Sequence, residues 1–197
     1  MRKIEITTVY FNNKNPESSN CETVGECRKR RKLYELIGSL EAGVFFVVLL
    51  FVFLIRGVGV EGASMEPTLK NGDYVIVSSH FYDVERGDIV VIAPYKELEK
   101  PIIKRVIGVE GDVIDIDFKK HKVYVNSQEI DEPYVGALIA KSYDVEFPIK
   151  VREDTYFVLG DNRNDSMDSR DSKVGLVPEN MVFGKVLFKM IPFGTIK

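Results

Sequence analysis

The segment from Leu36 to Ile55 constrains the fold of this 197-residue chain more than any other part of it. Glu41 is its only charged residue, and the sequence from Ala42 to Ile55 is apolar without interruption. Twenty residues of α-helix extend about 30 Å, which matches the hydrocarbon thickness of a bilayer. A helix buried in a soluble core would be amphipathic, whereas this stretch is apolar on every face. We therefore expect one transmembrane helix within residues 33–56.

The charges around this segment predict its orientation. Five consecutive cations, Arg28 to Lys32, precede it, and residues 1–32 carry eight Lys and Arg against four Asp and Glu. By the positive-inside rule, residues 1–32 form a cytoplasmic tail and residues 57–197 an extracytoplasmic domain. No Ala-X-Ala cleavage pattern follows Ile55, which favours an uncleaved, single-pass anchor in the plasma membrane over a removed signal peptide.

Composition excludes some functions for the domain after the anchor. Residues 57–197 carry eighteen Lys and Arg against twenty-four Asp and Glu, so no broad basic surface for nucleic acid is expected. Cys21 and Cys27 both precede the span, and the domain has no cysteine. We therefore expect no disulfide, no metal site and no cofactor.

Residues 57–197 have the pattern of a mainly β domain. Short runs rich in β-branched and aromatic residues are bounded by Gly, Asp or Pro, at residues 73–77, 88–92, 101–108, 112–117, 122–125, 155–159 and 185–191. Spacings this short favour antiparallel strands over a parallel sheet with crossover helices. The expected fold is an antiparallel β-sandwich or barrel-like domain that follows one N-terminal transmembrane helix.

Ser64 and Lys104 are the residues whose surroundings point to chemistry. Ser64 lies in a turn punctuated by Gly62 and Pro67, where most serines only cap the local backbone. Lys104 and Arg105 interrupt an apolar strand, so alternation points one of these two cations toward a packed face. A lysine in apolar surroundings has a lowered pKa and serves as a general base, although a lysine on an edge strand can instead extend to water. Forty residues separate the pair, and the spacing alone does not bring them together.

Four segments, taken in order, resemble the sequence boxes of a known family. They are Gly62 to Leu69, Gly72 to Val77, Lys104 to Asp112, and Gly160 to Arg163 with Ser166, Asp168, Ser169 and Arg170. Together, behind a single apolar segment, they resemble bacterial type I signal peptidases of the compact, single-span subtype. The resemblance covers about residues 33–190.

This resemblance implies a membrane-anchored serine endopeptidase with a Ser-Lys dyad that removes signal peptides from exported preproteins. It implies that Ser64 is the nucleophile, that Lys104 is the general base, and that Ser166 hydrogen-bonds the lysine amine. The Ser64 N–H would bind the oxyanion, and Gly62 stands where some relatives supply a second donor hydroxyl. The supporting polar residues it implies are Arg105, Asp161, Arg163, Asp168 and Arg170, the last two as a buried ion pair.

The same resemblance predicts what the site binds. Met65, Leu69, Ile102 and Ile103 are expected to wall shallow apolar pockets beside Ser64, which would admit alanine and give an Ala-X-Ala preference. The expected partners are signal peptides of exported preproteins, membrane lipid and the secretion translocon, with no nucleic acid.

Two other functions fit parts of the pattern. A self-cleaving repressor of the Ser-Lys class would need a DNA-binding helix-turn-helix and an internal Ala-Gly scissile bond, and neither is apparent. An anchored β-domain that binds exported peptides without cleaving them stays open, although such a module has no need for both Ser64 and Lys104.

Overall fold

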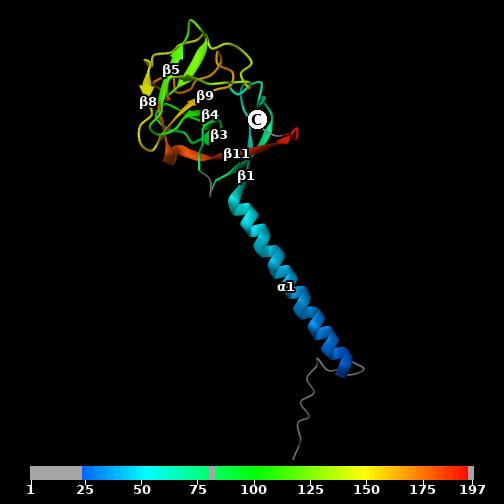
Figure 1. The fold of residues 1–197 in the computed structure, drawn as a ribbon. Coiled ribbons are helices and arrows are strands. Elements are labelled where there is room, and N and C mark those ends of the chain that lie inside the picture. The colour runs from blue at the N-terminus through cyan, green and yellow to red at the C-terminus, as the bar shows by residue number, and fades with distance from the viewer. Residues whose placement is uncertain (1–23, 80–82, 195–197) are drawn as a thin grey trace, which may run out of the picture. The chain divides into compact units, whose positions relative to one another are not determined.

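The structure is a computed structural model that describes residues 24–79 and 83–194, without the side chains of residues 24–27, 50, 51 and 53–55. Within these residues, one α-helix, α1 (Val24–Leu54), precedes eleven strands, and a short 3-10 helix, η2 (Glu179–Met181), lies before the last strand (Figure 1). The chain divides into two compact units between Leu50 and Phe51, close to the start of the domain expected at residue 57. Cys21 and most of the expected cytoplasmic tail lie outside the described residues.

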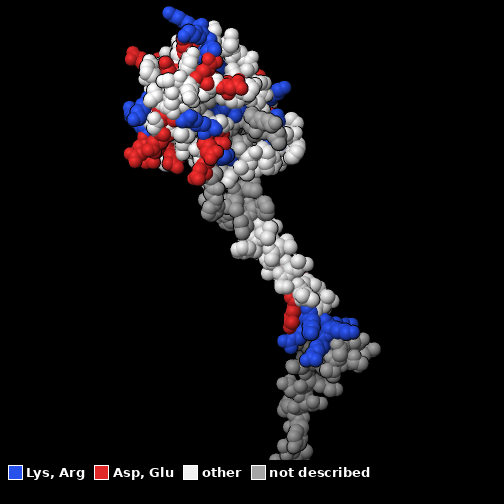
Figure 2. All heavy atoms as spheres, in the orientation of Figure 1, with Lys and Arg blue, Asp and Glu red and all other residues white. Residues whose placement is uncertain are grey.

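Helix α1 begins nine residues before the expected start of the span at residue 33 and includes the basic cluster. Figure 2 shows Lys and Arg side chains gathered near the N-terminal end of α1, followed by a long stretch with little charge. Arg31 Nε donates to Glu35 Oε1 at 3.0 Å, one helical turn away. The apolar side chains from Val44 to Leu49 are exposed.

Among the described residues, no helix is both long enough and apolar enough to cross a membrane. The span expected over Leu36 to Ile55 includes residues 50, 51 and 53–55, whose side chains lie outside the description. The helix ends at Leu54, and Ile55 is the first residue of a strand. The transmembrane helix therefore stays a prediction.

Two antiparallel sheets form the second unit. The larger has the order β1-β2-β11-β3-β4-β9-β10, and the smaller has the order β7-β6-β5-β8. The bounds of the larger sheet are β1 (Ile55–Gly59), β2 (Tyr74–Ser78), β3 (Ile89–Ile92), β4 (Ile102–Gly108), β9 (Thr155–Leu159), β10 (Val177–Pro178) and β11 (Val182–Ile191). Those of the smaller are β5 (Val113–Asp117), β6 (Lys122–Val125), β7 (Gln128–Glu129) and β8 (Ile149–Lys150). The mainly β, antiparallel fold class is confirmed.

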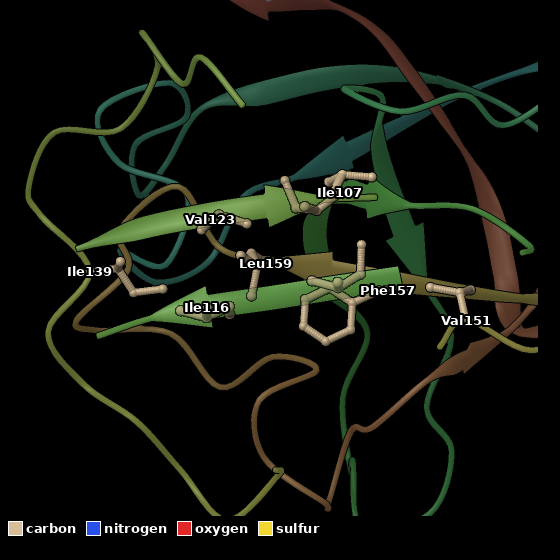
Figure 3. Close-up of a cluster of buried hydrophobic side chains, with 9 residues drawn as sticks. Ile107, Ile116, Val123, Ile139, Val151, Phe157 and Leu159 are labelled. Atoms are coloured by element: carbon tan, nitrogen blue, oxygen red, sulfur yellow. The ribbon is translucent and has the colours of Figure 1, made fainter. Parts of the chain in front are cut away.

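Apolar packing joins the two sheets. Ile107 of β4 and Phe157 and Leu159 of β9 meet Ile116 of β5 and Val123 of β6 in one buried cluster (Figure 3). Strands β5, β6 and β9 each contribute two alternate residues to this cluster, as the period of a pleated strand requires. The packing fixes the end of β9, from which a loop of site residues departs.

Strand β3 is buried on both faces, which explains the environment of its neighbour β4. Ile89 and Val91 belong to one core cluster, and Val90 and Ile92 belong to another. Strand β4 lies between β3 and β9, so it is central to the sheet.

Both of the adjacent cations on β4 face packed structure, although alternation requires this of only one of them. Lys104 is 2% exposed and Arg105 is 3% exposed. Alternation does place them on opposite faces, but Lys104 to Gly108 are all buried, so both faces of this part of β4 are covered. Each cation therefore needs its own hydrogen bonds or its own negatively charged partner inside the protein.

Candidate active site

Ser64 lies in the loop that connects β1 to β2. Val60 N donates to Asp73 O at 2.8 Å and Gly72 N donates to Val60 O at 2.9 Å, so the loop is closed at its base. Met65 anchors it in the core cluster below, where its side chain is 2% exposed. Ser64 itself is half-buried at the surface of this anchored loop.

Lys104 reaches Ser64 from the neighbouring part of the large sheet. Its Nζ donates to Ser64 Oγ at 2.8 Å and to the Ile103 carbonyl oxygen at 2.9 Å. Burial lowers the pKa of Lys104 from 10.5 to about 8, although the negative charges of Asp168 and Asp161 act in the opposite direction. At neutral pH a chemically useful fraction of this amine is therefore uncharged.

Asp161 connects the Ser64 loop to the strand that carries Lys104. Its carboxylate accepts hydrogen bonds from Arg105 Nε at 2.8 Å and Arg105 Nη2 at 2.7 Å, and from Thr68 Oγ1 at 2.5 Å. Arg105 also donates to the Gly87 carbonyl oxygen at 2.8 Å, and its guanidinium lies 3.9 Å from the ring centroid of Tyr134. The buried charge of Arg105 is thus paired, hydrogen-bonded and stacked.

A second buried pair organises the loop after β9. Arg170 donates to both carboxylate oxygens of Asp168 at 2.8 Å, and neither side chain is exposed. Asp168 Oδ2 also accepts the Gly160 N–H at 3.1 Å, while Arg170 Nη2 donates to the Arg163 carbonyl oxygen at 2.6 Å. Arg163 in turn forms an ion pair with Glu132. These contacts give residues 160–170 one defined conformation.

The hydrogen bond expected between Ser166 and the Lys104 amine is absent. Within the described residues, the buried Ser166 Oγ has no hydrogen-bond partner. The amine donates instead to Ser64 and to the carbonyl of its own neighbour, Ile103. Ser166 still borders the site, because a Cβ at Gly160 would lie 2.2 Å from Ser166 Oγ and 2.5 Å from the Ser64 carbonyl oxygen.

A groove of about 640 Å³ opens beside Ser64 and Lys104. Met65, Ile102 and Ile103 line it as expected, and Val58 and Val60 of the β1 region line it as well. Leu69 does not fit the expectation of a pocket wall, because its side chain is fully buried in the core beneath the loop. Glu61 and Lys100, 3.9 Å apart and exposed, also lie along this groove.

Over residues 24–79 and 83–194, no group of three or more His, Cys, Asp or Glu side chains is arranged to hold a metal ion. The Lys104 amine contacts the Ser64 hydroxyl, and Asp161 holds the Ser64 loop through the Thr68 hydroxyl. This arrangement can support acyl transfer through a serine hydroxyl and a neutral amine.

Comparison with known proteins agrees with this chemistry. Residues 33–191 match the family model described as signal peptidase, peptidase S26. The chain belongs to this family. It is 34% identical over 182 residues to signal peptidase I of Bacillus licheniformis, a match that covers 86% of this chain and 94% of the relative. It is 36% identical over 188 residues to signal peptidase IB of Staphylococcus aureus, covering 85% and 94%.

Among solved structures, a signal peptidase I from Enterococcus faecalis is 26% identical, and the match covers 54% of this chain and 98% of that one with a TM-score of 0.46.

Sequence reasoning missed several residues of this peptidase S26 site. Thr68 and Asn162 lie inside the two boxes that carry the family resemblance, so a signal for them was present. Glu132 and Tyr134 lie between strands, in a segment without periodicity, and only the folded chain brings them to Arg163 and Arg105.

Proposed function

We propose that this member of the signal peptidase family is a serine endopeptidase that removes N-terminal signal peptides from exported preproteins with a Ser64–Lys104 dyad. The observation that carries the proposal is the 2.8 Å contact between Lys104 Nζ and Ser64 Oγ, with the amine buried beside an apolar groove. A serine hydroxyl becomes a nucleophile when an adjacent base accepts its proton, and a desolvated lysine supplies that base.

The chemistry follows from this contact. When Lys104 has lost its proton, the Ser64 hydroxyl donates to the amine and passes its proton there as Oγ attacks the scissile carbonyl. The Ser64 backbone N–H stabilises the resulting oxyanion. The lysine ammonium then protonates the departing amine, which becomes the N-terminus of the mature protein. Water, deprotonated by Lys104, hydrolyses the acyl-enzyme and frees the signal peptide.

The groove favours an extended substrate with small side chains. Strand β1 is at the edge of the large sheet, and β4 pairs with β9 only from Arg105 onward. A peptide can therefore hydrogen-bond along the free edges near Gly59 and Ile102, with alternate side chains entering the groove. Shallow apolar walls from Met65, Ile102 and Ile103 favour Ala at the first and third residues before the scissile bond.

This specificity can be tested with one preprotein. Replacing Ala directly before the scissile bond with Leu or Lys should stop cleavage, whereas changing the residue between the two alanines should matter little. Efficient cleavage after Lys would refute the pocket assignment.

We propose further that α1 anchors the enzyme in the plasma membrane, with residues 1–32 cytoplasmic and the catalytic domain outside. The apolar run from Ala42 to Ile55 and the preceding cations support this topology. An impermeant thiol reagent should leave Cys21 and Cys27 unlabelled in intact cells and label both after permeabilisation. Labelling in intact cells would reverse the proposed orientation.

The dyad is tested with the purified full chain in detergent and a preprotein carrying an Ala-X-Ala site. Ser64→Ala and Lys104→Ala should each abolish cleavage, and the double variant should be no worse, because the two residues act as a unit. Lys104→Arg should fail as well, since a guanidinium keeps its proton. Substantial cleavage by Lys104→Ala would eliminate the mechanism.

A further inference from the structure

Asn162 contacts the protein backbone on both sides of Ser64. It follows Asp161 in the loop after β9, and its backbone N–H donates to the Ser64 carbonyl oxygen at 3.0 Å. Its side-chain Nδ2 donates to the Ala63 carbonyl oxygen at 3.2 Å. A carbonyl oxygen only accepts hydrogen bonds, so the NH₂ end of the amide must face Ala63. These two carbonyls belong to the two peptide groups that flank the Ser64 Cα.

The contact with Ala63 controls the direction of the Ser64 N–H. The Ala63 carbonyl and the Ser64 N–H belong to one trans peptide group, in which they point in opposite directions. The Ala63 oxygen is held by two donors, Asn162 Nδ2 and the Glu66 N–H at 3.1 Å. The plane of this peptide is therefore fixed from the carbonyl side, and its N–H points away from Asn162.

The Ser64 N–H is available for a substrate. Within the described part of the chain it donates to no protein acceptor, and Ser64 lines the groove. Gly62 has no side chain to provide another donor. Donors at the carbonyl end of a peptide also polarise it and strengthen its N–H as a donor.

We propose that the Asn162 side chain is a positioning residue that aims and polarises the Ser64 N–H as the oxyanion donor. The proposal rests on the proposed function. It gives Asn162 a role distinct from those of the nucleophile Ser64 and the base Lys104, namely to orient the oxyanion donor. Asn162 acts through the Ala63–Ser64 peptide and not on the substrate itself. Its effect should consequently appear in the tetrahedral states of the reaction and not in substrate binding.

The test measures kcat and KM for an Ala-X-Ala peptide with the full chain in detergent. Removing one oxyanion donor outright lowers kcat by about 100-fold to 1,000-fold, so loss of a group that aims the donor should cost about 10-fold to 100-fold. Asn162→Ala should therefore lower kcat by that factor and leave KM within about twofold.

A peptide aldehyde ending in Ala gives a second readout. The Ser64 hydroxyl adds across its carbonyl to form a reversible hemiacetal, whose oxygen occupies the place of the oxyanion. Its inhibition constant should rise in Asn162→Ala in proportion to the fall in kcat, whereas a merely structural role would not couple the two.

Asn162→Asp keeps the shape of the side chain and removes its N–H. An ionised carboxylate would also repel the Ala63 carbonyl, so this variant should have a lower kcat than Asn162→Ala. It keeps the test decisive if Asn162→Ala does not fold.

Asn164→Ala is the matched control. Its amide lies in the same loop but bonds away from the site, donating to the Leu138 carbonyl at 2.9 Å and accepting the Ala140 N–H at 3.0 Å. We expect wild-type kcat from this variant.

Wild-type kcat in Asn162→Ala or in Asn162→Asp, or a raised KM at unchanged kcat, would overturn the proposal for Asn162. The proposed function fails separately, if the wild-type chain does not cleave the peptide or if Ser64→Ala still does.

Discussion

The amine of Lys104 has exchanged the water around its charge for two hydrogen bonds, to Ser64 Oγ and to the Ile103 carbonyl. Burial is the largest influence on this group and lowers its pKa from 10.5 to about 8. Because the neutral amine is the proposed base, kcat/KM should rise about tenfold per pH unit below pH 8 and level off above it. The pH profile of peptide cleavage checks this, and a rate that is constant between pH 6 and 9 would contradict it.

The same burial means that Lys104 lowers the free energy of unfolding. Its pKa is lowered in the folded state, so the unfolded chain binds the extra proton between about pH 8 and 10.5, and stability rises with pH across that window. Below it the penalty is complete and on the order of 3 kcal/mol. Replacing Lys104 with Met should therefore increase the free energy of unfolding at pH 7 by about 1–3 kcal/mol, since some of the gain is lost with the two hydrogen bonds.

Denaturant unfolding at pH 7 and pH 10 measures this effect, which should shrink at the higher pH. Lys122→Met is the control, because Lys122 is exposed and pairs with Glu129, so no comparable gain is expected. A destabilised Lys104→Met at pH 7 would show that the amine is stabilised overall in its buried position.

Strand β4 carries two adjacent buried cations, and the protein compensates their charges in different ways. Arg105 differs from Lys104 in that its charge cannot be released, so it depends on the carboxylate of Asp161. Arg105→Met would leave that carboxylate buried without its partner and should lower the free energy of unfolding by about 3–5 kcal/mol. Arg105→Met with Asp161→Asn should lose less than the sum of the single changes.

A double-mutant cycle from denaturant unfolding gives the coupling between Arg105 and Asp161, which we expect to be about 1–3 kcal/mol. Arg86→Met is a matched comparison, because Arg86 pairs with Asp112 but its side chain is 47% exposed. Arg86→Met should lower the free energy of unfolding less than Arg105→Met does. Equal losses at the two arginines, with no coupling at Arg105, would mean that burial does not strengthen the Arg105–Asp161 pair.

The sequence pattern predicts the longer strands of the domain and misses the shortest ones and the first. Strands β2 to β6 and β9 were predicted because β-branched residues between turn residues give a clear signal, as at residues 113–117. Strand β1 was missed because Ile55 continues the apolar run of α1, and the two-residue strands β7, β8 and β10 are too short to show periodicity. Strand β11 begins at Val182, three residues earlier than predicted.

The sequence predicts which residues form the site better than it predicts the contacts between them. Ser64 and Lys104 were identified in their sequence boxes, but only the fold brings side chains forty residues apart to 2.8 Å. The hydrogen bond from Asn162 to the Ala63 carbonyl depends on how two loops pack against each other. Such a contact produces no periodic pattern in the sequence from which it could be predicted.

At the scale of the whole molecule, the division between Leu50 and Phe51 places all of α1 except its last four residues in a different unit from the residues of the proposed site. The nucleophile, the base and the buried pairs all belong to the unit Phe51–Lys197, which also holds the three buried core clusters. None of the hydrogen bonds and ion pairs described for the site involves a residue of 28–49, the part of the first unit whose side chains the structure describes. Under the proposed topology the contribution of the first unit is to confine the enzyme to the membrane that holds the signal peptide.

Removing residues 1–50 should separate these two contributions. A chain of residues 51–197 should cleave a short, soluble Ala-X-Ala peptide with kcat/KM within about threefold of the full chain, because the site is intact. A preprotein inserted in lipid vesicles should be cleaved about 100-fold more slowly, since tethering both molecules to one bilayer raises their effective concentration by about that factor or more.

The control for this comparison is the same preprotein dissolved in detergent, where no shared bilayer exists and the two chains should differ little. Full-length Ser64→Ala should leave both substrates intact, which excludes a contaminating protease. If residues 51–197 cleave the vesicle-inserted preprotein as fast as the full chain, tethering by α1 contributes nothing to the reaction. If they lose activity on the soluble peptide as well, residues 1–50 support the fold of the catalytic unit, and its independence is refuted.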